Sequence, residues 1–345
     1  MDMLAPNTDE TSYLLNLIAG SWTSDVLAAA VDLELPDLLD ETPRNAAELA
    51  VLTHCEPAAL ARLLRAMATI EICAEGPDGF FAITPTGARL RENHPQSLHF
   101  WSISWTRSMR PLWTHLVESV RSGRSVTKTV TGFEGFERQQ QDPAVAARFN
   151  KTMVELTRLV ASAVARMYDF AAVHTVVDVG GGYGELILEI LRHAPHLTGT
   201  LFDLPHAIDG ARQRVHDAGL SPRCRCVAGD FFDGVPAGAD LYVLKSIIHD
   251  WPDHRARTIL EACHRAMPPA GRLLLVERVR PDRTHNCEVH RQIARSDLTM
   301  LLGLGSAERS EREFHDLLAS AGFRIRGVDP GTLSFSLIEA VPRGR

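Results

Sequence analysis

A glycine-rich run, Asp178-Val-Gly-Gly-Gly-Tyr-Gly184, is the strongest chemical signal in the sequence. It follows a segment expected to be a strand and precedes one expected to be a helix. Glycines at such a turn let the backbone bend sharply and approach a ligand closely. The dinucleotide pattern G-x-G-x-x-G would place its third glycine at Glu185, so the observed spacing of Gly180, Gly182 and Gly184 disfavours a dinucleotide site.

Acidic residues end the next two expected strands. Asp203 ends the first, and Asp230, followed by Phe231, ends the second. A carboxylate at the first position can accept both hydroxyls of a ribose; an acid with a neighbouring ring can bind the adenine amine and pack on the purine. Because parallel strands end at one edge of a sheet, we expect these groups to share one ligand. Asp203 taken alone could instead cap the following helix.

A histidine follows the fourth expected strand, in the run Lys245-Ser-Ile-Ile-His249-Asp250-Trp251. This places the histidine beside the inferred ligand, a position that the ordinary readings of a single histidine do not explain. A satisfied core histidine, or a metal ligand paired with His254, are the alternatives. No cluster of side chains has metal-ligand spacing, so we expect no metal.

Strands and helices alternate in the second half of the chain, which predicts an α/β fold with a mainly parallel sheet. The strands are expected at residues 175–179, 198–203, 225–230, 240–244 and 272–276, with an antiparallel pair at 323–328 and 333–340. Helices are expected at residues 185–192, 206–218 and 255–267. A capping box, Ser310-x-x-Glu313, opens one more helix.

The first half reads as helical, with a hairpin signal at residues 71–83 that predicts a winged helix. An apolar stripe begins it at Leu14, Leu17 and Ile18. We place the domain boundary near residue 165, giving a mainly helical domain at 1–165 and the α/β domain at 166–345. DNA binding is the alternative for a winged helix, but only Arg62 and Arg65 would face a groove.

Composition and charge narrow the classes of partner that we expect this chain to bind. The 345 residues carry a net charge of −7 and six sparse cysteines, so we expect no nucleic-acid partner, and reduced thiols. The start, MDMLAPNTDE, has no signal-peptide pattern, and no apolar stretch reads as long enough to span a bilayer. The sequence therefore predicts a cytoplasmic protein without a membrane partner.

These motifs together resemble the S-adenosylmethionine (SAM)-dependent small-molecule O-methyltransferases, the family of plant caffeate-type enzymes and bacterial enzymes that tailor aromatic natural products. The resemblance covers nearly the whole chain and implies a class I methyltransferase Rossmann-like sheet after a winged-helix dimerisation and lid domain. It implies SAM as cofactor, S-adenosylhomocysteine as product, and a homodimer. The motifs are the glycine run, Phe149-Asn-Lys-Thr-Met153, Phe202-Asp-Leu-Pro205, Gly229-Asp-Phe231, His249-Asp-Trp251 and Glu308-Arg-Ser310.

The resemblance also implies residue roles. His249 is the expected general base, flanked by Glu277 and Glu308, and which glutamate orients it stays open. The expected cofactor ligands are Asp178, Gly180, Gly182, Asp203, Leu204, Asp230, Phe231 and Lys245. The expected acceptor pocket contains Phe149, Met153, Asp250 and Met300, with the segment from Trp101 to Trp113 nearby.

A phenol is the natural acceptor for such a site, because its oxygen becomes a good nucleophile once the proton leaves. The pKa gap between a phenol and an ordinary histidine is about 3.5 units, or about 5 kcal/mol. A carboxylate on the far ring nitrogen and a nearby sulfonium would both reduce that cost. We expect a polycyclic aromatic acceptor, such as a hydroxyphenazine, a naphthoate or an aromatic polyketide. The alternatives are hydroxylation or decarboxylation without net methyl transfer, an N-methyltransferase, or a SAM-sensing regulator.

Overall fold

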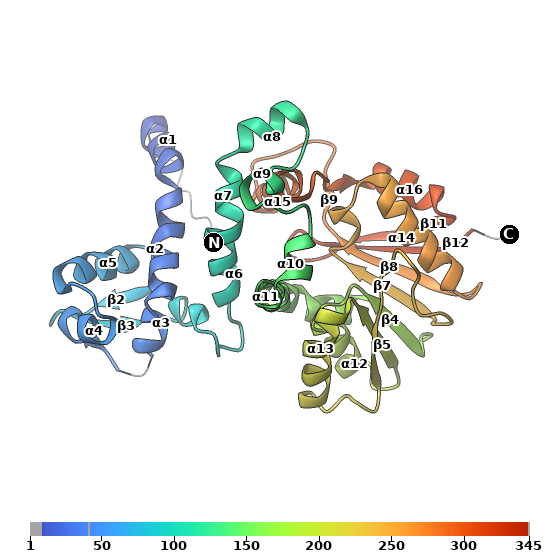
Figure 1. The fold of residues 1–345 in the computed structure, drawn as a ribbon, viewed down its shortest axis with the longest axis horizontal. Helices are drawn as coiled ribbons and strands as arrows, with labels where there is room; N and C mark the ends of the chain where they lie inside the picture. Colours follow the sequence, from blue (N-terminus) through green and yellow to red (C-terminus); the bar gives the residue numbers. More distant parts are fainter. Residues whose placement is uncertain (1–8, 41, 344–345) are drawn as a thin grey trace. The chain divides into compact units, whose positions relative to one another are not determined.

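The structure, a computed structural model, describes residues 9–40 and 42–343 (Figure 1). Most of the MDMLAPNTDE start lies outside the described residues. The chain divides into two compact units, residues 1–108 and 109–345. We describe each unit by itself.

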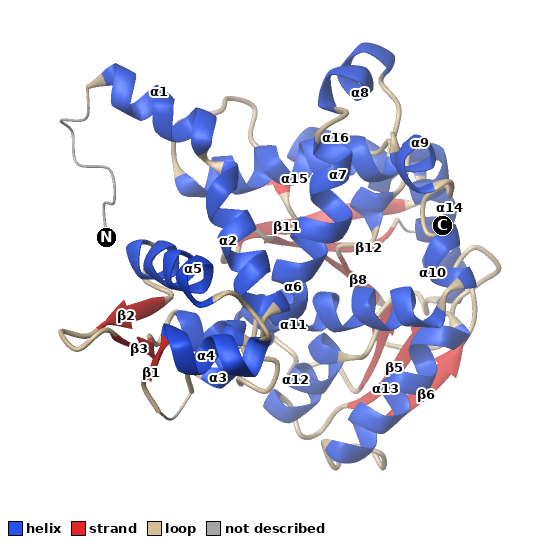
Figure 2. Ribbon diagram, turned by 60° about the vertical axis from the view of Figure 1, so that its left-hand side comes forward, coloured by secondary structure: helices blue, strands red, loops and turns tan. Residues whose placement is uncertain are grey.

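The first unit is mainly helical. A three-stranded sheet of order β1-β3-β2 forms its wing, beside α4 and α5 in Figure 2. Its elements are α1 (Glu10–Ala19), α2 (Ser21–Asp32), α3 (Leu35–Leu38), β1 (Arg44–Asn45), α4 (Ala46–Thr53), α5 (Pro57–Thr69), β2 (Cys73–Glu75), β3 (Phe80–Ile83), η1 (Gly87–Leu90) and α6 (His99–Ser104). The predicted helices and hairpin are thus present.

The apolar stripe at the start of this unit is not part of its core. The side chains of Leu14, Leu17 and Ile18 are 56%, 60% and 71% exposed. Glu10–Asp32, which spans α1 and α2, is long and apolar enough to cross a membrane by length and composition alone, as a core helix or a signal sequence also can be. This corrects the expectation that no stretch reaches that length. Apolar surface of this extent needs a covering partner.

The second unit holds the remaining elements, which begin with η2 (Trp105–Met109) at the unit boundary. Its helices are α7 (Arg110–Trp113), α8 (Leu116–Ser122), α9 (Thr127–Thr131), α10 (Glu137–Gln141), α11 (Pro143–Met167), α12 (Glu185–His193), α13 (Pro205–Asp217), η3 (Ile248–Asp250), α14 (Asp253–Ala266), α15 (Glu288–Leu304) and α16 (Glu311–Ser320). Its strands are β4 (Thr175–Val179), β5 (Thr198–Asp203), β6 (Cys224–Ala228), β7 (Leu241–Lys245), β8 (Arg272–Glu277), β9 (Val279–Arg280), β10 (Arg309–Ser310), β11 (Phe323–Pro330) and β12 (Ser336–Pro342).

A seven-stranded sheet of order β11-β12-β8-β7-β4-β5-β6 organises the second unit. Strands β4 to β8 run parallel, whereas β12 and β11 are antiparallel, as predicted. Buried side chains of α11, α12 and α13 cover one face, and those of α14 and α16 cover the other (Figure 1). The strand order reverses between β4 and β7, which places a ligand crevice at the carboxyl ends of the strands.

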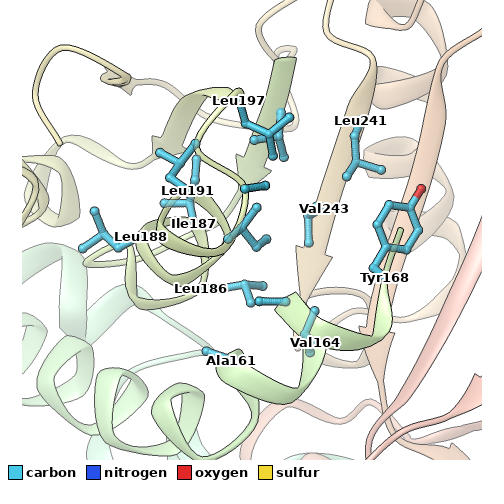
Figure 3. Packing of buried hydrophobic residues seen from close by; sticks show 14 of the residues in the cluster. Ala161, Val164, Tyr168, Leu186, Ile187, Leu188, Leu191, Leu197, Leu241 and Val243 are labelled. Carbon is cyan, nitrogen blue, oxygen red and sulfur yellow. The ribbon is translucent and has the colours of Figure 1, made fainter. Parts of the chain in front are cut away.

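Helix α11 belongs to the sheet-containing unit, which corrects the predicted boundary near residue 165. Its side chains Ala161 and Val164 pack against Leu186 of α12 and the sheet residue Val243 (Figure 3). Asp142 caps the helix through the amides of Ala144 and Val145, as the Asp-Pro signal predicts. The boundary therefore falls at residues 108/109, inside the tryptophan-rich segment. The sequence missed this because a long amphipathic helix does not reveal which unit it covers.

Glu185, at the start of α12, joins three helices of the second unit. Its carboxylate binds Arg158 of α11 at 3.1 Å and also Arg214 of α13. Its side chain is only 14% exposed, so these contacts are largely shielded from water.

We expect Glu185→Gln to lower the free energy of unfolding by about 2 kcal/mol, because it removes the largely buried negative charge that two arginines contact. Urea unfolding followed by circular dichroism measures this. Glu189→Gln, which removes an exposed pair with Arg192 on the same helix, should cost less than about 0.5 kcal/mol. Equal effects of the two substitutions would contradict the assignment.

Candidate active site

The glycine run lies at the carboxyl end of β4, as predicted. Gly180, Gly182 and Gly184 have φ values of +71°, +56° and +83°, which only glycine adopts easily. A Cβ on Gly180 would lie 2.5 Å from Ile247 Cδ1, and one on Gly184 would lie 2.4 Å from Leu201 Cδ1. A side chain at either position would therefore force Ile247 or Leu201 to move, whereas a Cβ on Gly182 would meet only Asn150 Oδ1, at 3.7 Å.

Two carboxylates shape this loop. Asp178 is buried, and its Oδ2 has no hydrogen-bond partner among the described residues. Asp203 Oδ2 accepts from the Gly182 amide at 2.7 Å, and its Oδ1 accepts from the Leu204 amide at 2.6 Å. Burial and the neighbouring Asp203 charge raise the pKa of Asp178 to about 7. Burial also raises the pKa of Asp203. A cationic ligand would relieve both penalties.

Asp230 and Phe231 lie at the same edge of the sheet. Asp230 Oδ1 accepts from the Phe232 amide at 2.9 Å, which fixes the turn after β6. A Cβ on Gly180 would be 3.8 Å from the Phe231 ring, so the ring borders the glycine loop. Lys245 ends β7, and burial lowers its pKa to about 8. These positions agree with the predicted cofactor ligands, whose binding stays a prediction.

His249 lies in η3 and is surrounded by carboxylates. Its Nδ1 is 3.0 Å from Glu308 Oε1 and 3.9 Å from Glu277 Oε2, while its Nε2 is 3.3 Å from Asp250 Oδ1. His249, Glu277 and Glu308 are 6%, 0% and 1% exposed. Ser296 of α15 donates a second hydrogen bond to Glu308 Oε1, at 2.5 Å. Glu308 is thus the carboxylate that orients the ring.

Glu277 acts on the backbone instead. Its Oε1 accepts from the amides of Ile247 and Ile248 at 3.0 and 2.8 Å. It therefore holds the turn that carries His249, and contributes charge to the ring from 3.9 Å. The sequence left open which glutamate orients the histidine, and the direct hydrogen bond to Nδ1 favours Glu308.

The carboxylates control the ionisation of the histidine. Burial disfavours the imidazolium, but the charges of Glu308, Glu277 and Asp250 outweigh it and raise the pKa of His249 to about 10. Burial raises the pKa of Asp250 to about 7, despite the opposing effect of His249. The three carboxylates therefore make His249 a stronger base than an ordinary histidine.

Aromatic side chains form a series of ring contacts that ends at Trp251, beside this turn. The Phe149 ring of α11 lies 5.8 Å from Phe136, which lies 6.0 Å from Trp251. Met153 follows Phe149 by one helical turn, so the two share a face of α11. Met300 lies on α15, one turn beyond the Ser296 that binds Glu308. Asp250 is in η3 and Met300 is on a helix that packs against η3, whereas the Phe149 face of α11 is linked to Trp251 through Phe136.

The structure also assembles a trio that the sequence spacing did not predict. Donor atoms of His249, Glu277 and Glu308 lie within 4.8 Å of one another, as metal ligands can. However, the 3.0 Å contact between Nδ1 and Oε1 is a direct hydrogen bond, and Glu277 Oε1 is occupied by two amides. This arrangement favours a base held by acids over a metal site.

Sequence reasoning missed four residues of this site. Asn150, Ser296, Asp297 and Phe136 carry no motif-level signal of their own, although Asn150 is part of the Phe149-Asn motif. Asp297 Oδ1 accepts from the Glu308 amide at 2.9 Å. The buried Nδ2 of Asn150 has no hydrogen-bond partner among the described residues and lies beside the glycine loop.

Comparison with known protein families identifies both parts of the chain. Residues 113–324 match an O-methyltransferase domain, and residues 15–93 match an O-methyltransferase dimerisation domain. The chain belongs to the O-methyltransferase family. It is a SAM-dependent O-methyltransferase with a class I methyltransferase fold and a mainly helical N-terminal dimerisation domain.

Individual relatives support this assignment. The chain is 41% identical over 333 residues to the O-demethylpuromycin-O-methyltransferase of Streptomyces alboniger, covering 95% of this chain and 88% of the relative. The crystal structure of LaPhzM matches with a TM-score of 0.93 and 37% identity, over 97% of this chain and 100% of the other. The structure of NcsB1 from neocarzinostatin biosynthesis, in complex with SAM and 2-hydroxy-5-methyl naphthoic acid, matches with a TM-score of 0.81 and 31% identity, over 98% and 100%.

The residues present fit SAM. The unpartnered oxygen of Asp178 is a ready acceptor for an ammonium group, and the unpartnered amide of Asn150 is a donor at the same loop. The cofactor also carries a sulfonium, which suits the excess of carboxylates at this edge. Asp178, Asp203 and Asp230, with the glycines and Phe231, would hold it.

We expect SAM affinity to fall as pH drops below the pKa of Asp178, about 7, because only the ionised carboxylate attracts a cation. Requiring this one ionisation predicts about tenfold weaker binding at pH 6 than at pH 8. Calorimetric titration at both pH values measures it. The control, Asp178→Asn, should bind weakly with little pH dependence; a wild-type-like pH dependence in this variant would refute the role of Asp178.

Proposed function

We propose that the enzyme methylates a phenolic hydroxyl of a flat, polycyclic aromatic natural product, with His249 as general base. One observation carries this proposal: a buried histidine has its Nδ1 held by Glu308 at 3.0 Å, with its Nε2 on the other side of the ring, next to Asp250 at 3.3 Å. Hydroxyphenazines, naphthoates and aromatic polyketides are the candidate acceptors. The naphthoic acid bound in one matched structure, that of NcsB1, agrees with this class.

The proposed reaction is an in-line displacement. Bound SAM supplies an electrophilic methyl group on a sulfonium. The acceptor oxygen gives its proton to His249 Nε2 and uses the released electron pair to form the new C–O bond, while the C–S bond breaks and its electrons return to sulfur. Glu308 stabilises the imidazolium that results, and Glu277 keeps η3 in place.

The carboxylates make this proton transfer nearly balanced. A phenol and an ordinary histidine differ by about 3.5 pKa units, a cost of about 5 kcal/mol. The pKa of His249, raised to about 10, closes most of this gap.

The proposal of a flat aromatic acceptor is supported by the aromatic side chains near η3. Phe149, Phe136 and Trp251 offer ring faces and edges near η3, and Met153 and Met300 offer flexible apolar surface. Such a lining favours a planar apolar molecule over a sugar or a peptide. Asp250, 3.3 Å from His249 Nε2, would face the polar edge of the acceptor.

We also propose that the chain is a homodimer through its N-terminal unit and works in the cytoplasm without a nucleic-acid or membrane partner. The match of residues 15–93 to a dimerisation domain supports this. The exposed apolar side chains Leu14, Leu17 and Ile18 supply a surface for a second copy.

The His249→Ala variant should keep SAM affinity and lose at least tenfold in turnover, because general-base catalysis contributes about 10²- to 10⁴-fold. The assay is mass spectrometry of S-adenosylhomocysteine and methylated product with a panel of hydroxylated tricyclic aromatics. Undiminished turnover would remove His249 from the mechanism. Consumption of acceptor without methylated product would favour the hydroxylation or decarboxylation alternative.

The wild-type kcat/KM should rise with pH by about tenfold per unit below the pKa of His249, because a proton must leave the enzyme–acceptor pair. Since Glu308 raises that pKa, Glu308→Gln should move the rising limb to lower pH and reduce the maximal rate. Chelation with EDTA should change neither profile. An unshifted limb in Glu308→Gln would contradict the pairing, and activity lost to EDTA and restored by a divalent ion would contradict a metal-free base.

Replacing Leu17 and Ile18 together by glutamate should convert the dimer to a monomer, because two charges would enter an apolar interface. Light scattering at micromolar concentration measures the mass. A wild-type chain that is already a monomer would refute the dimer, and Arg326→Met on β11 serves as a control that should not change the mass.

A further inference from the structure

Arg309 makes an unusual set of contacts beside the base. It is 6% exposed. Its Nη1 donates to the Ile248 carbonyl at 2.8 Å, and its Nη2 donates to the Trp251 carbonyl at 2.7 Å. Its Nε and Nη2 also reach Asp253 Oδ1, at 3.0 and 2.8 Å. The two carbonyls bracket His249 and Asp250, so one guanidinium spans the whole catalytic turn.

Glu277 holds the same turn from its amide side. The amides of Ile247 and Ile248 bind its Oε1, while Arg309 binds the carbonyls of Ile248 and Trp251. The carboxylate of Glu277 therefore holds backbone amides at η3, and the guanidinium of Arg309 holds backbone carbonyls there. A single 3₁₀ turn has few bonds of its own, so these side chains determine where His249 points.

A small sheet couples the two side chains. Glu277 ends β8, and two residues later Val279 of β9 pairs with Arg309 of β10. Glu308, which binds His249 Nδ1 at 3.0 Å, precedes Arg309 directly. One dipeptide thus orients the imidazole through Glu308 and its backbone through Arg309. The turn also contains Ser246 at φ +53°, a conformation that needs surrounding support in a residue other than glycine.

We propose that Arg309 is a positioning residue for methyl transfer, holding η3 so that His249 Nε2 faces the acceptor oxygen. The proposal rests on the proposed function of His249 as the base. Arg309 touches neither the imidazole nor an acceptor directly. Its planar fork suits two carbonyls at once, which a lysine ammonium on a flexible stem cannot reproduce. A displacement of the base by about 1 Å is enough to lower turnover by about 100-fold.

The test compares Arg309→Met, Arg309→Lys and Asp253→Asn with the full-length wild type. We expect Arg309→Met to lower kcat at least tenfold while the Kd for SAM, measured by calorimetry, stays within threefold. Arg309→Lys should retain an intermediate kcat. Asp253→Asn should lose less than threefold, because Asp253 is 82% exposed and Arg309 keeps both carbonyl contacts. Arg326→Met, which removes an exposed ion pair with Glu339 on β11 and β12, is the matched control and should retain wild-type kcat.

A spectroscopic measurement separates positioning from general loss of structure. In ¹⁵N-histidine-labelled protein, the His249 ring signals, assigned by their absence in His249→Gln, should shift in Arg309→Met and remain unchanged in Arg326→Met. A kcat within threefold of wild type for Arg309→Met, or unshifted ring signals, would overturn the proposal. An equal loss of SAM affinity and kcat would assign Arg309 to folding and overturn it too. If His249→Ala retains full turnover, the proposed function fails whatever Arg309 does.

Discussion

The hydrogen bond between His249 and Glu308, closed off from water, is the interaction on which the catalytic half of this protein depends. At 3.0 Å it fixes the ring, and with Glu277 and Asp250 it raises the pKa of His249 to about 10. Burying an acid and a base together is costly unless each has further partners. Ser296 supplies a further partner to Glu308 Oε1, and two backbone amides hold the neighbouring Glu277.

The cofactor edge follows a different rule. There the backbone conformation shapes the loop: glycines at positive φ turn between strand and helix, and a hydrogen bond from Gly182 joins the loop to Asp203 at the end of the next strand. The unpartnered oxygen of Asp178 is the exception. A buried polar group without a partner calls for an explanation, and the family to which the chain belongs uses SAM as cofactor.

In the N-terminal unit, the amphipathic pattern predicts the helices but not the surfaces that they pack against. Its apolar stripe predicted a helix, and the helices are present, but Leu17 and Ile18 are exposed. An apolar helix face indicates that another surface packs on it, but it does not identify that surface. The match to a dimerisation domain identifies a second copy as the covering surface to test. The same ambiguity affected α11, whose stripe packs on α12 and so moves the unit boundary to residues 108/109.

Local patterns were sufficient to predict which candidate residues follow the strands, because strands and turns depend mainly on neighbouring residues. The residues that follow strand ends in this way are the glycine run, Asp203, Asp230 and His249. The family was also evident from these motifs together. Tertiary structure alone decided that Glu308 rather than Glu277 binds the ring, that Ser296 and Asp297 support Glu308, and that Arg309 spans the turn. Those contacts join residues that are 11 to 61 positions apart in the sequence. Local sequence patterns do not reveal contacts over such separations, because only the folded sheet brings these residues together.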